Sequence, residues 1–306
     1  MPAYLLRRLL AFLPVLWAAV TLAFVALRLT PGDPAETLYA EAQISREQLA
    51  ANRAALGLDR PLPEQYFSFL GQLMRGDLGA SLFTGRPATT TILEQFGSTM
   101  ELALVGLLAA IGIGLTLGTL RVSATRPAAW AETLADALTA LSQSLPVAWT
   151  GLLSLWLTAG IFHLNASPLL ALLLPALVLG FAVAGPIARV TRASLVTLQN
   201  EAYIVAARAR GVHGSALLWH ILRVALIPIV NMTALQAAFL FGGTVVTETV
   251  FARPGLGRLL VDSLLRKDFP VVQGLVLLTA GLYLLFNLAA DLIAAALDPR
   301  LRPQIQ

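Results

Sequence analysis

The sequence contains no cysteine, and only 12% of its 306 residues are charged. The absence of cysteine excludes disulfides, thiolate metal sites and a cysteine nucleophile. The scarcity of charge is more informative, because soluble domains usually carry about 25% charged residues. With 57% hydrophobic residues and a mean hydropathy of +0.76, the chain has too little polar surface to cover itself in water. The composition therefore predicts a membrane protein.

Several catalytic signatures are also missing. No G-x-x-x-x-G-K-[ST] occurs, so the chain cannot hold nucleotide phosphates in a P-loop. The histidines, His163, His213 and His220, form no H-x-x-x-H or HExxH pair, and we predict no metal site. Ser142 and Ser144 have no histidine at membrane depth to activate them, which argues against an intramembrane enzyme. Basic residues are not interleaved with aromatic ones, so nucleic acid is not an expected partner.

Long apolar runs are what the sequence does have. A helix that crosses a membrane needs about 20 mostly apolar residues. Six segments meet that length: 9–29, 99–120, 133–161, 169–188, 228–250 and 274–297. Their continuity favours helices over the alternating strands of a barrel. Asp136, Gln143 and Pro146 interrupt the third segment, which predicts a kink there. The predicted fold class is all-α, a polytopic membrane protein with six transmembrane helices.

The first apolar run follows Arg7 and Arg8, as the apolar core of a signal peptide would. It is longer than such a core, which has about 7–15 residues, and no small-residue cleavage site follows it. We therefore interpret 9–29 as a retained first span.

The distribution of basic residues predicts the orientation. With a cytoplasmic N-terminus, the inside segments hold eleven arginines: Arg7, Arg8, Arg121, Arg126, Arg189, Arg192, Arg208, Arg210, Arg223, Arg300 and Arg302. The outside loop 251–273 then holds four basic residues, and the long outside segment 30–98 holds more acidic than basic residues. By the positive-inside rule, both termini of this multi-pass protein are expected in the cytoplasm.

This orientation divides the chain into regions. In chain order they are the N-terminal end with the first span (1–30), an extracytoplasmic subregion (31–98), a five-helix core (99–297) with a cytoplasmic loop (191–227), and a cytoplasmic tail (298–306). Within the extracytoplasmic subregion, short helices are expected near 45–56 and 64–75.

The cytoplasmic stretch 201-EAYIVAARARGVHGSALLWHILRVALIP-228 is amphipathic and basic, although it lies between two apolar runs. From Ala206 its pattern predicts a short helix, a break at 211-GVHG-214 and a second helix, with Pro228 starting the next span. A short helix beside a glycine turn fits a groove on a second protein. The alternative is an interfacial helix that lies on lipid headgroups, with its arginines binding phosphate.

This stretch resembles the cytoplasmic coupling loop, or EAA loop, of ABC-importer permeases. It is most similar to the A-R-A-x-G variant of the dipeptide, oligopeptide and nickel branch, which matches Ala207 to Gly211. One departure is Val205, where the family pattern has glutamate, and Glu201 lies one turn earlier. Further stretches resemble the same branch: 27-LRLTPGDPA-35, 56-LGLDRPLPEQY-66, 75-RGDLGASLFTGRP-87, 247-TETVFARPGLGRLLVDSLLRKDFPVVQG-274 and 297-LDPR-300.

The resemblance implies the type I permease fold, a place in the bacterial cytoplasmic (inner) membrane and a non-enzymatic role in ATP-driven import. The substrates would be peptides, or nickel and metal-chelate (metallophore) complexes, delivered by an extracytoplasmic solute-binding protein. A second homologous permease would complete the pore as a heterodimer, two ABC ATPase subunits would dock below, and membrane lipid would surround the spans. ATP and Mg would be bound by the ATPases, and no cofactor by this chain. The alternative, a stand-alone secondary transporter, needs coupling acids or broken helices in paired halves, which the sequence does not show.

The candidate site residues fall into three groups. The expected ATPase-docking residues are Glu201, Ala206, Ala207, Arg208, Ala209, Gly211 and His213. The candidates for a gate or a docking edge for the binding protein are Arg253, Pro254, Gly255 and Gly257. The alternative for this second group is a short amphipathic helix on the outer interface, with a stripe at Leu259, Leu260, Leu264 and Leu265. Glu248 either lines the translocation path or faces outside water.

Overall fold

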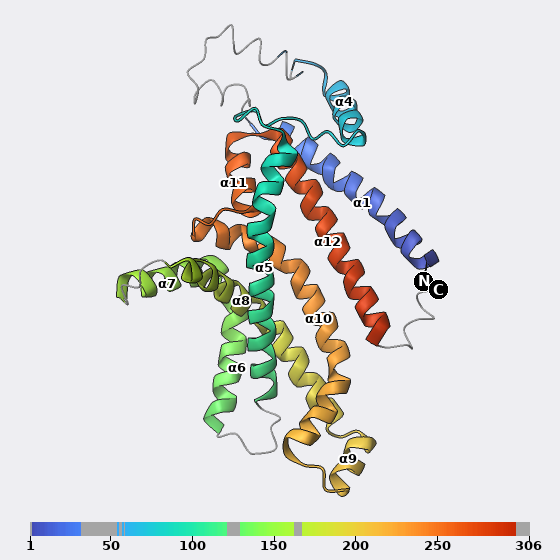
Figure 1. Cartoon of the computed structure of the whole chain (residues 1–306), viewed down its shortest axis with the longest axis vertical. Helices are drawn as coiled ribbons and strands as arrows, with labels where there is room; N and C mark the ends of the chain where they lie inside the picture. The colour runs from blue at the N-terminus through green and yellow to red at the C-terminus, as the bar shows by residue number, and fades with distance from the viewer. Residues whose placement is uncertain are drawn as a thin grey trace. The chain divides into compact units, whose positions relative to one another are not determined.

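The computed structural model describes residues 2–31, 54, 57, 59–120, 129–161 and 167–297. Helices dominate this part of the chain (Figure 1): α1 (Pro2–Leu29), α4 (Leu62–Met74), α5 (Ala88–Thr119), α6 (Ala129–Ser144), α7 (Val147–Leu155), a π-helical turn (Trp156–Ile161), α8 (Pro168–Leu198), α9 (Ala202–Ala209), α10 (Gly214–Val250), α11 (Leu256–Arg266) and α12 (Phe269–Leu297). Over the described residues, β pairing is limited to an isolated bridge between Ala80 and Pro87. The all-α prediction is confirmed. The helix expected near 64–75 is α4, whereas that near 45–56 lies almost wholly outside the described residues.

Long apolar helices account for most of the predicted spans. Five described helices could cross a membrane: Leu6–Leu29, Ala88–Thr119, Pro168–Leu198, Gly214–Leu240 and Phe269–Ile293. The third predicted span, 133–161, is instead divided into α6 and α7 at Pro146. Proline lacks an N–H and drives the residue before it out of the helical region, so the predicted kink is a full break. The apolar helix after the break is Val147–Gly160.

Three helices extend well beyond the apolar runs. α5 begins at Ala88 rather than 99, α8 continues to Leu198 rather than 188, and α10 begins at Gly214 rather than 228. The prediction that Pro228 starts a span is therefore wrong, because Pro228 lies inside α10. Ala225 (0% exposed) and Ile229 (3%) are buried on either side of it, and helices in membrane proteins tolerate proline where neighbouring groups satisfy the freed backbone.

The chain divides into two compact units. The first unit consists of residues 1–4, 100–253 and 283–306, and the second of residues 5–99 and 254–282. These units are defined by contacts within the protein, whereas the regions predicted from the sequence were defined by their position relative to the membrane. Those regions stay a prediction.

Within the first unit, α8 is the central helix, packed against α6, α7 and α10. Glycine permits its close approach to α5, because a Cβ added to Gly180 would lie 2.6 Å from the carbonyl oxygen of Gly106. Small residues at such crossings let helix backbones meet closely in membranes. An ion pair between Asp136 of α6 and Arg192 of α8, at 2.5 Å, joins α8 to α6.

Within the second unit, one buried carboxylate fixes the loop before α5. Asp268 is 4% exposed. It accepts hydrogen bonds from the Ser81 hydroxyl at 2.5 Å and from the Leu82 N–H at 3.1 Å. Burial raises the pKa of Asp268 above its ordinary value, although both hydrogen bonds act in the opposite direction. An apolar cluster around Ile92 and Leu256 forms the core of this unit.

Candidate functional site

Helix α9 ends in a hydrogen-bonded glycine cap. Gly211 has a φ of +86°, a left-handed value that residues with a Cβ rarely adopt. Its N–H donates to the carbonyl oxygen of Arg208 at 2.9 Å, and the N–H of Val212 donates to that of Ala207 at 3.1 Å. This pair of bonds is a Schellman motif, which satisfies carbonyl groups that a helix end otherwise leaves open. The A-R-A-x-G spacing places glycine at the position that closes the helix.

One face of α9 is buried against its own chain. A cluster of buried side chains from α8, α9 and α10 holds it: Leu195, Ile204, Ala207, Leu217, Ile221, Ala225 and Ile229. Val212, at the glycine cap, packs against the same cluster. A helix of eight residues is too short to be stable alone. The cluster therefore joins α9 to the end of α8 and the start of α10 as one packed body.

The opposite face of α9 is exposed, and most of the predicted docking residues lie there. The exposed ones are Glu201, Ala206, Arg208, Ala209, Gly211 and His213. Ala207 is only 5% exposed, so it contributes packing within the chain rather than contact surface.

Three apolar residues that were not among the predicted docking residues are also exposed in this region. They are Tyr203 (44% exposed) and Val205 (53%) on α9, and Trp219 (63%) in the first turns of α10. The sequence did contain a signal for Tyr203 and Val205. Ile204 and Ala207 are three residues apart, as residues on one face of a helix are, and both are buried in the structure.

Arg253, a predicted gate residue, is anchored in the first unit. Its side chain is 13% exposed and pairs with Glu101 of α5 at 2.6 Å. It also donates a hydrogen bond to the carbonyl oxygen of Ala171 in α8 at 3.3 Å. The turn that carries Arg253 is thereby tied to two helices.

The residues after Arg253 are anchored in the second unit. The carbonyl oxygen of Pro254 accepts a hydrogen bond from the Ser98 hydroxyl at 2.6 Å, and the N–H of Leu256 donates to the Thr99 hydroxyl at 2.8 Å. Pro254 is exposed, whereas Gly255 and Gly257 are buried. Ser98 and Thr99 were not singled out in the sequence, because the turn they hold lies far along the chain.

The amphipathic helix expected as the alternative for this region is present as α11. Leu259 and Leu260 pack against the core cluster, whereas Leu264 (51% exposed) and Leu265 (74%) face outward. The predicted leucine stripe is thus divided between the core and the surface. The gate or docking role of this region stays a prediction.

Glu248 is fully buried (0% exposed) in α10 and so does not face outside water, one of its two predicted positions. Other polar residues of α10 are buried as well: Gln236, Thr244 and Thr247. The place of Glu248 on a translocation path stays a prediction.

Comparison with known proteins gives a consistent result over the whole chain. The family model described as "Binding-protein-dependent transport system inner membrane component" matches residues 110–303, and its N-terminal companion matches residues 1–103. The glutathione transport system permease protein GsiC of Pectobacterium atrosepticum is 40% identical over 98% of both chains, and that of Salmonella typhimurium 37% over 98% of both. A probable peptide ABC transporter permease of Sinorhizobium fredii is 34% identical over 99% of this chain and all of its own.

Proposed function

This chain belongs to the family of inner membrane components of binding-protein-dependent transport systems and is a permease subunit of an ABC importer, and we propose that it passes peptides. As a member of this family it is a multi-pass inner membrane protein and not an enzyme. ATP hydrolysis takes place on separate subunits, and a substrate-binding protein is a further partner. The secondary transporter considered above is not favoured.

The peptide class is proposed from the relatives. Their names specify glutathione and peptides, and glutathione is itself a small peptide. Neither name specifies nickel or a metal chelate, so the nickel and metal-chelate prediction stays untested and is not part of the proposal.

The observation that carries the coupling mechanism is the packing of α9. Its exposed face presents Ala206, Arg208 and Ala209, whereas its inner face is buried against α8 and α10. A displacement imposed on the exposed face would move the start of α10 with it, since the buried cluster joins them. Packed helices transmit such movements as hinge or shear displacements. We propose that α9 docks on an ATPase subunit in this way.

The remaining arrangement follows from the same proposal. Both termini lie in the cytoplasm, because this orientation puts most arginines of short loops, and the α9 face, on the side of the ATPases. A second, different permease completes the pore. ATP and Mg bind to the ATPase subunits, and this chain binds no cofactor.

Transport by the whole complex tests the proposal. The permeases and ATPases are co-purified, reconstituted in liposomes and supplied with their binding protein, ATP and a labelled substrate. We expect ATP-dependent uptake of glutathione or other short peptides and no uptake of nickel or metal chelates at equal concentrations. Uptake of metal chelates alone would overturn the peptide assignment, and uptake without ATPase subunits would overturn the permease mechanism.

A further inference from the structure

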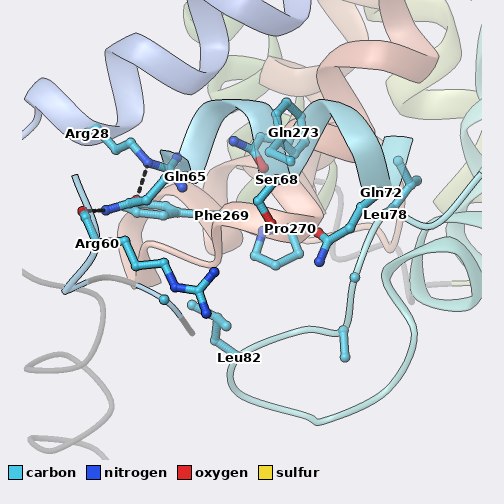
Figure 2. A pocket seen from close by; sticks show the side chains of 14 residues that line it. Arg28, Arg60, Gln65, Ser68, Gln72, Leu78, Leu82, Phe269, Pro270 and Gln273 are labelled. Atoms are coloured by element: carbon cyan, nitrogen blue, oxygen red, sulfur yellow. Dashed lines mark hydrogen bonds between the residues drawn. The ribbon is translucent and has the colours of Figure 1, made fainter. Parts of the chain in front are cut away.

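A cavity of about 300 Å³ in the second unit is lined by apolar residues and by several cationic and amide side chains (Figure 2). Arg28 of α1 and Arg60 contribute guanidinium groups, and Gln65, Gln72 and Gln273 contribute amides. Among the described residues that line it, none is acidic. A cavity with this lining favours a ligand that carries negative charge and accepts hydrogen bonds.

Two nitrogen atoms in the lining are buried and have no hydrogen-bond partner within the described part of the chain. They are Nη1 of Arg28 and Nε2 of Gln273, a residue that is only 5% exposed. An unsatisfied buried donor is costly, and more so when it is charged. A guanidinium group can only donate, so its missing partner is an acceptor. A ligand or ordered water in the cavity would give both atoms a partner.

The Arg28 side chain is held in place before any ligand arrives. Its Nε donates to the Oε1 of Gln65 at 2.9 Å, and the Nε2 of Gln65 donates to the Arg60 carbonyl oxygen at 2.8 Å, as the dashed lines in Figure 2 show. Its Cζ lies 3.6 Å from the ring centroid of Phe24, a cation–π contact. With Nε and one face engaged, the terminal N–H groups remain to bind a ligand.

An apolar groove of about 340 Å³ shares Arg28 with this cavity and runs between α1 and α4. It is lined by Val25 of α1 and by Leu62 and Phe67 of α4, and Leu62 (55%) and Phe67 (69%) are exposed. A hydrogen bond of 2.8 Å between the hydroxyls of Thr21 and Tyr66 holds the two helices together. α4 has 13 residues and is too short to cross a bilayer, so its exposed apolar side chains need another cover.

We propose that the cavity and the groove together bind one anionic phospholipid at the end of α1, with its phosphate on Arg28 and Arg60 and an acyl chain between α1 and α4. A soluble oxyanion would use the cavity alone and leave the groove uncovered. A phospholipid accounts for both features. Its charged headgroup is covalently joined to its acyl chains, and the cavity and the groove likewise adjoin each other at Arg28, which lines both. The segment Leu6–Leu29 of α1 is long and apolar enough to cross a membrane, which would place lipid beside the groove.

The test measures lipid binding to the purified full-length protein in its complex by native mass spectrometry. Phosphatidylglycerol is the probe, and phosphatidylcholine is the neutral comparison. We expect Arg28→Gln to weaken phosphatidylglycerol binding about tenfold or more, because a charge-assisted hydrogen bond is lost. Arg75→Gln is the matched control, since Arg75 is an exposed arginine next to α4 that lines neither site, and we expect no change there.

Val25→Trp provides a second test that leaves the contacts of Arg28 intact. It fills the groove, and we expect weaker binding of both lipids. Glycerol 3-phosphate, which has the phosphate without acyl chains, should not displace the lipid. Unchanged affinity in both variants would overturn the proposal. Displacement by glycerol 3-phosphate, or by a short peptide through its carboxylate, would also overturn it and indicate a site for soluble oxyanions.

Discussion

The backbone N–H of Val212 donates to the carbonyl oxygen of Ala207 at 3.1 Å, and this bond closes α9. Both residues also belong to the apolar packing that holds α9 on α8 and α10. The end of the proposed docking helix and its attachment to the rest of the protein are thus one structural feature. The A-R-A-x-G spacing is explained by local backbone geometry, because it places glycine where the helix ends.

The first prediction concerns the cap glycine. Gly211→Val places a β-branched residue at a φ of +86°, at a cost of about 1–3 kcal/mol, and should disorder the end of α9. We expect ATP-dependent transport to fall sharply, while Gly211→Asn, which tolerates this conformation, retains most of it.

Gly76 supplies the matched control. It has a φ of +76° at the end of α4, where its N–H donates to the Leu73 carbonyl oxygen at 2.9 Å and that of Asp77 to Gln72 at 3.0 Å. This is the same Schellman motif in a different place. Gly76→Val should cost similar stability and leave transport coupled to ATP hydrolysis. Equal loss of coupling in both valine variants would contradict a special role for Gly211.

The second prediction concerns the crossing of α5 and α8. Gly180→Ala would place its Cβ 2.6 Å from the Gly106 carbonyl oxygen and 2.8 Å from the Ala109 Cβ, so the two helices must separate. Gly112→Ala, also on α5, meets nothing within 4 Å. We expect the first variant to lower the midpoint of thermal unfolding in detergent and the second to leave it unchanged or raise it. Similar midpoints for the two would show that the crossing is not tightly packed.

The third prediction concerns Arg253 and Glu101. The Arg253 side chain is 13% exposed, and its Nη2 lies 2.6 Å from the Oε2 of Glu101. A double-mutant cycle using Arg253→Gln and Glu101→Gln should therefore give a coupling energy of about 1 kcal/mol. The pair Arg86–Glu94, whose side chains are about half exposed, should couple less. Unfolding of the purified protein provides the measurement. A larger coupling for the exposed pair would contradict the structural role assigned to Arg253.

The fourth prediction follows from the raised pKa of Asp268. The folded protein keeps this proton at pH values where an unfolded carboxyl, with its ordinary pKa of 3.8, has lost it. The contribution of Asp268 to stability is therefore largest below the pKa of the unfolded carboxyl group. It declines as the pH rises through the pKa of Asp268 in the folded protein. Asp268→Asn cannot ionise and should remove this dependence. The stability of the wild type relative to the variant should decrease as the pH rises.

Asp262→Asn serves as the control for this pH series, because Asp262 lies on the same unit with its side chain 56% exposed. Thermal unfolding midpoints are compared from about pH 4, close to the ordinary pKa of a carboxyl group, to about pH 7. Parallel pH profiles for the wild type and Asp268→Asn would show that Asp268 does not titrate in this range.

The sequence predicted the fold class and the short helix with its glycine break, because both depend on local patterns. Long apolar runs identify spans, and glycine at the end of a helix identifies a cap. Proline was interpreted less well. Pro146 breaks a helix, whereas Pro228 lies inside α10 between the buried residues Ala225 and Ile229. Sequence patterns do not contain that packing.

The cavity at Arg28 was also beyond sequence reasoning. Arg28 and Gln273 lie near opposite ends of the chain, and only the fold of the second unit brings them to one cavity. The same holds for Ser81 and Asp268, whose hydrogen bond no local pattern predicts. The predicted docking residues lie in one contiguous stretch of the sequence, and even there the buried position of Ala207 required the packed structure.

The most direct test of the central claim is a cross-link from α9 to an ATPase subunit. The chain has no cysteine, so Ala206→Cys introduces a single thiol on the exposed face of α9, and Ala207→Cys places one on the buried face. A short thiol-reactive photo-cross-linker is attached in the assembled complex, and its products are identified by mass spectrometry. The account predicts that position 206 cross-links to the ATPase and position 207 does not. Efficient labelling of position 206 with cross-links only to lipid or to this chain would contradict it.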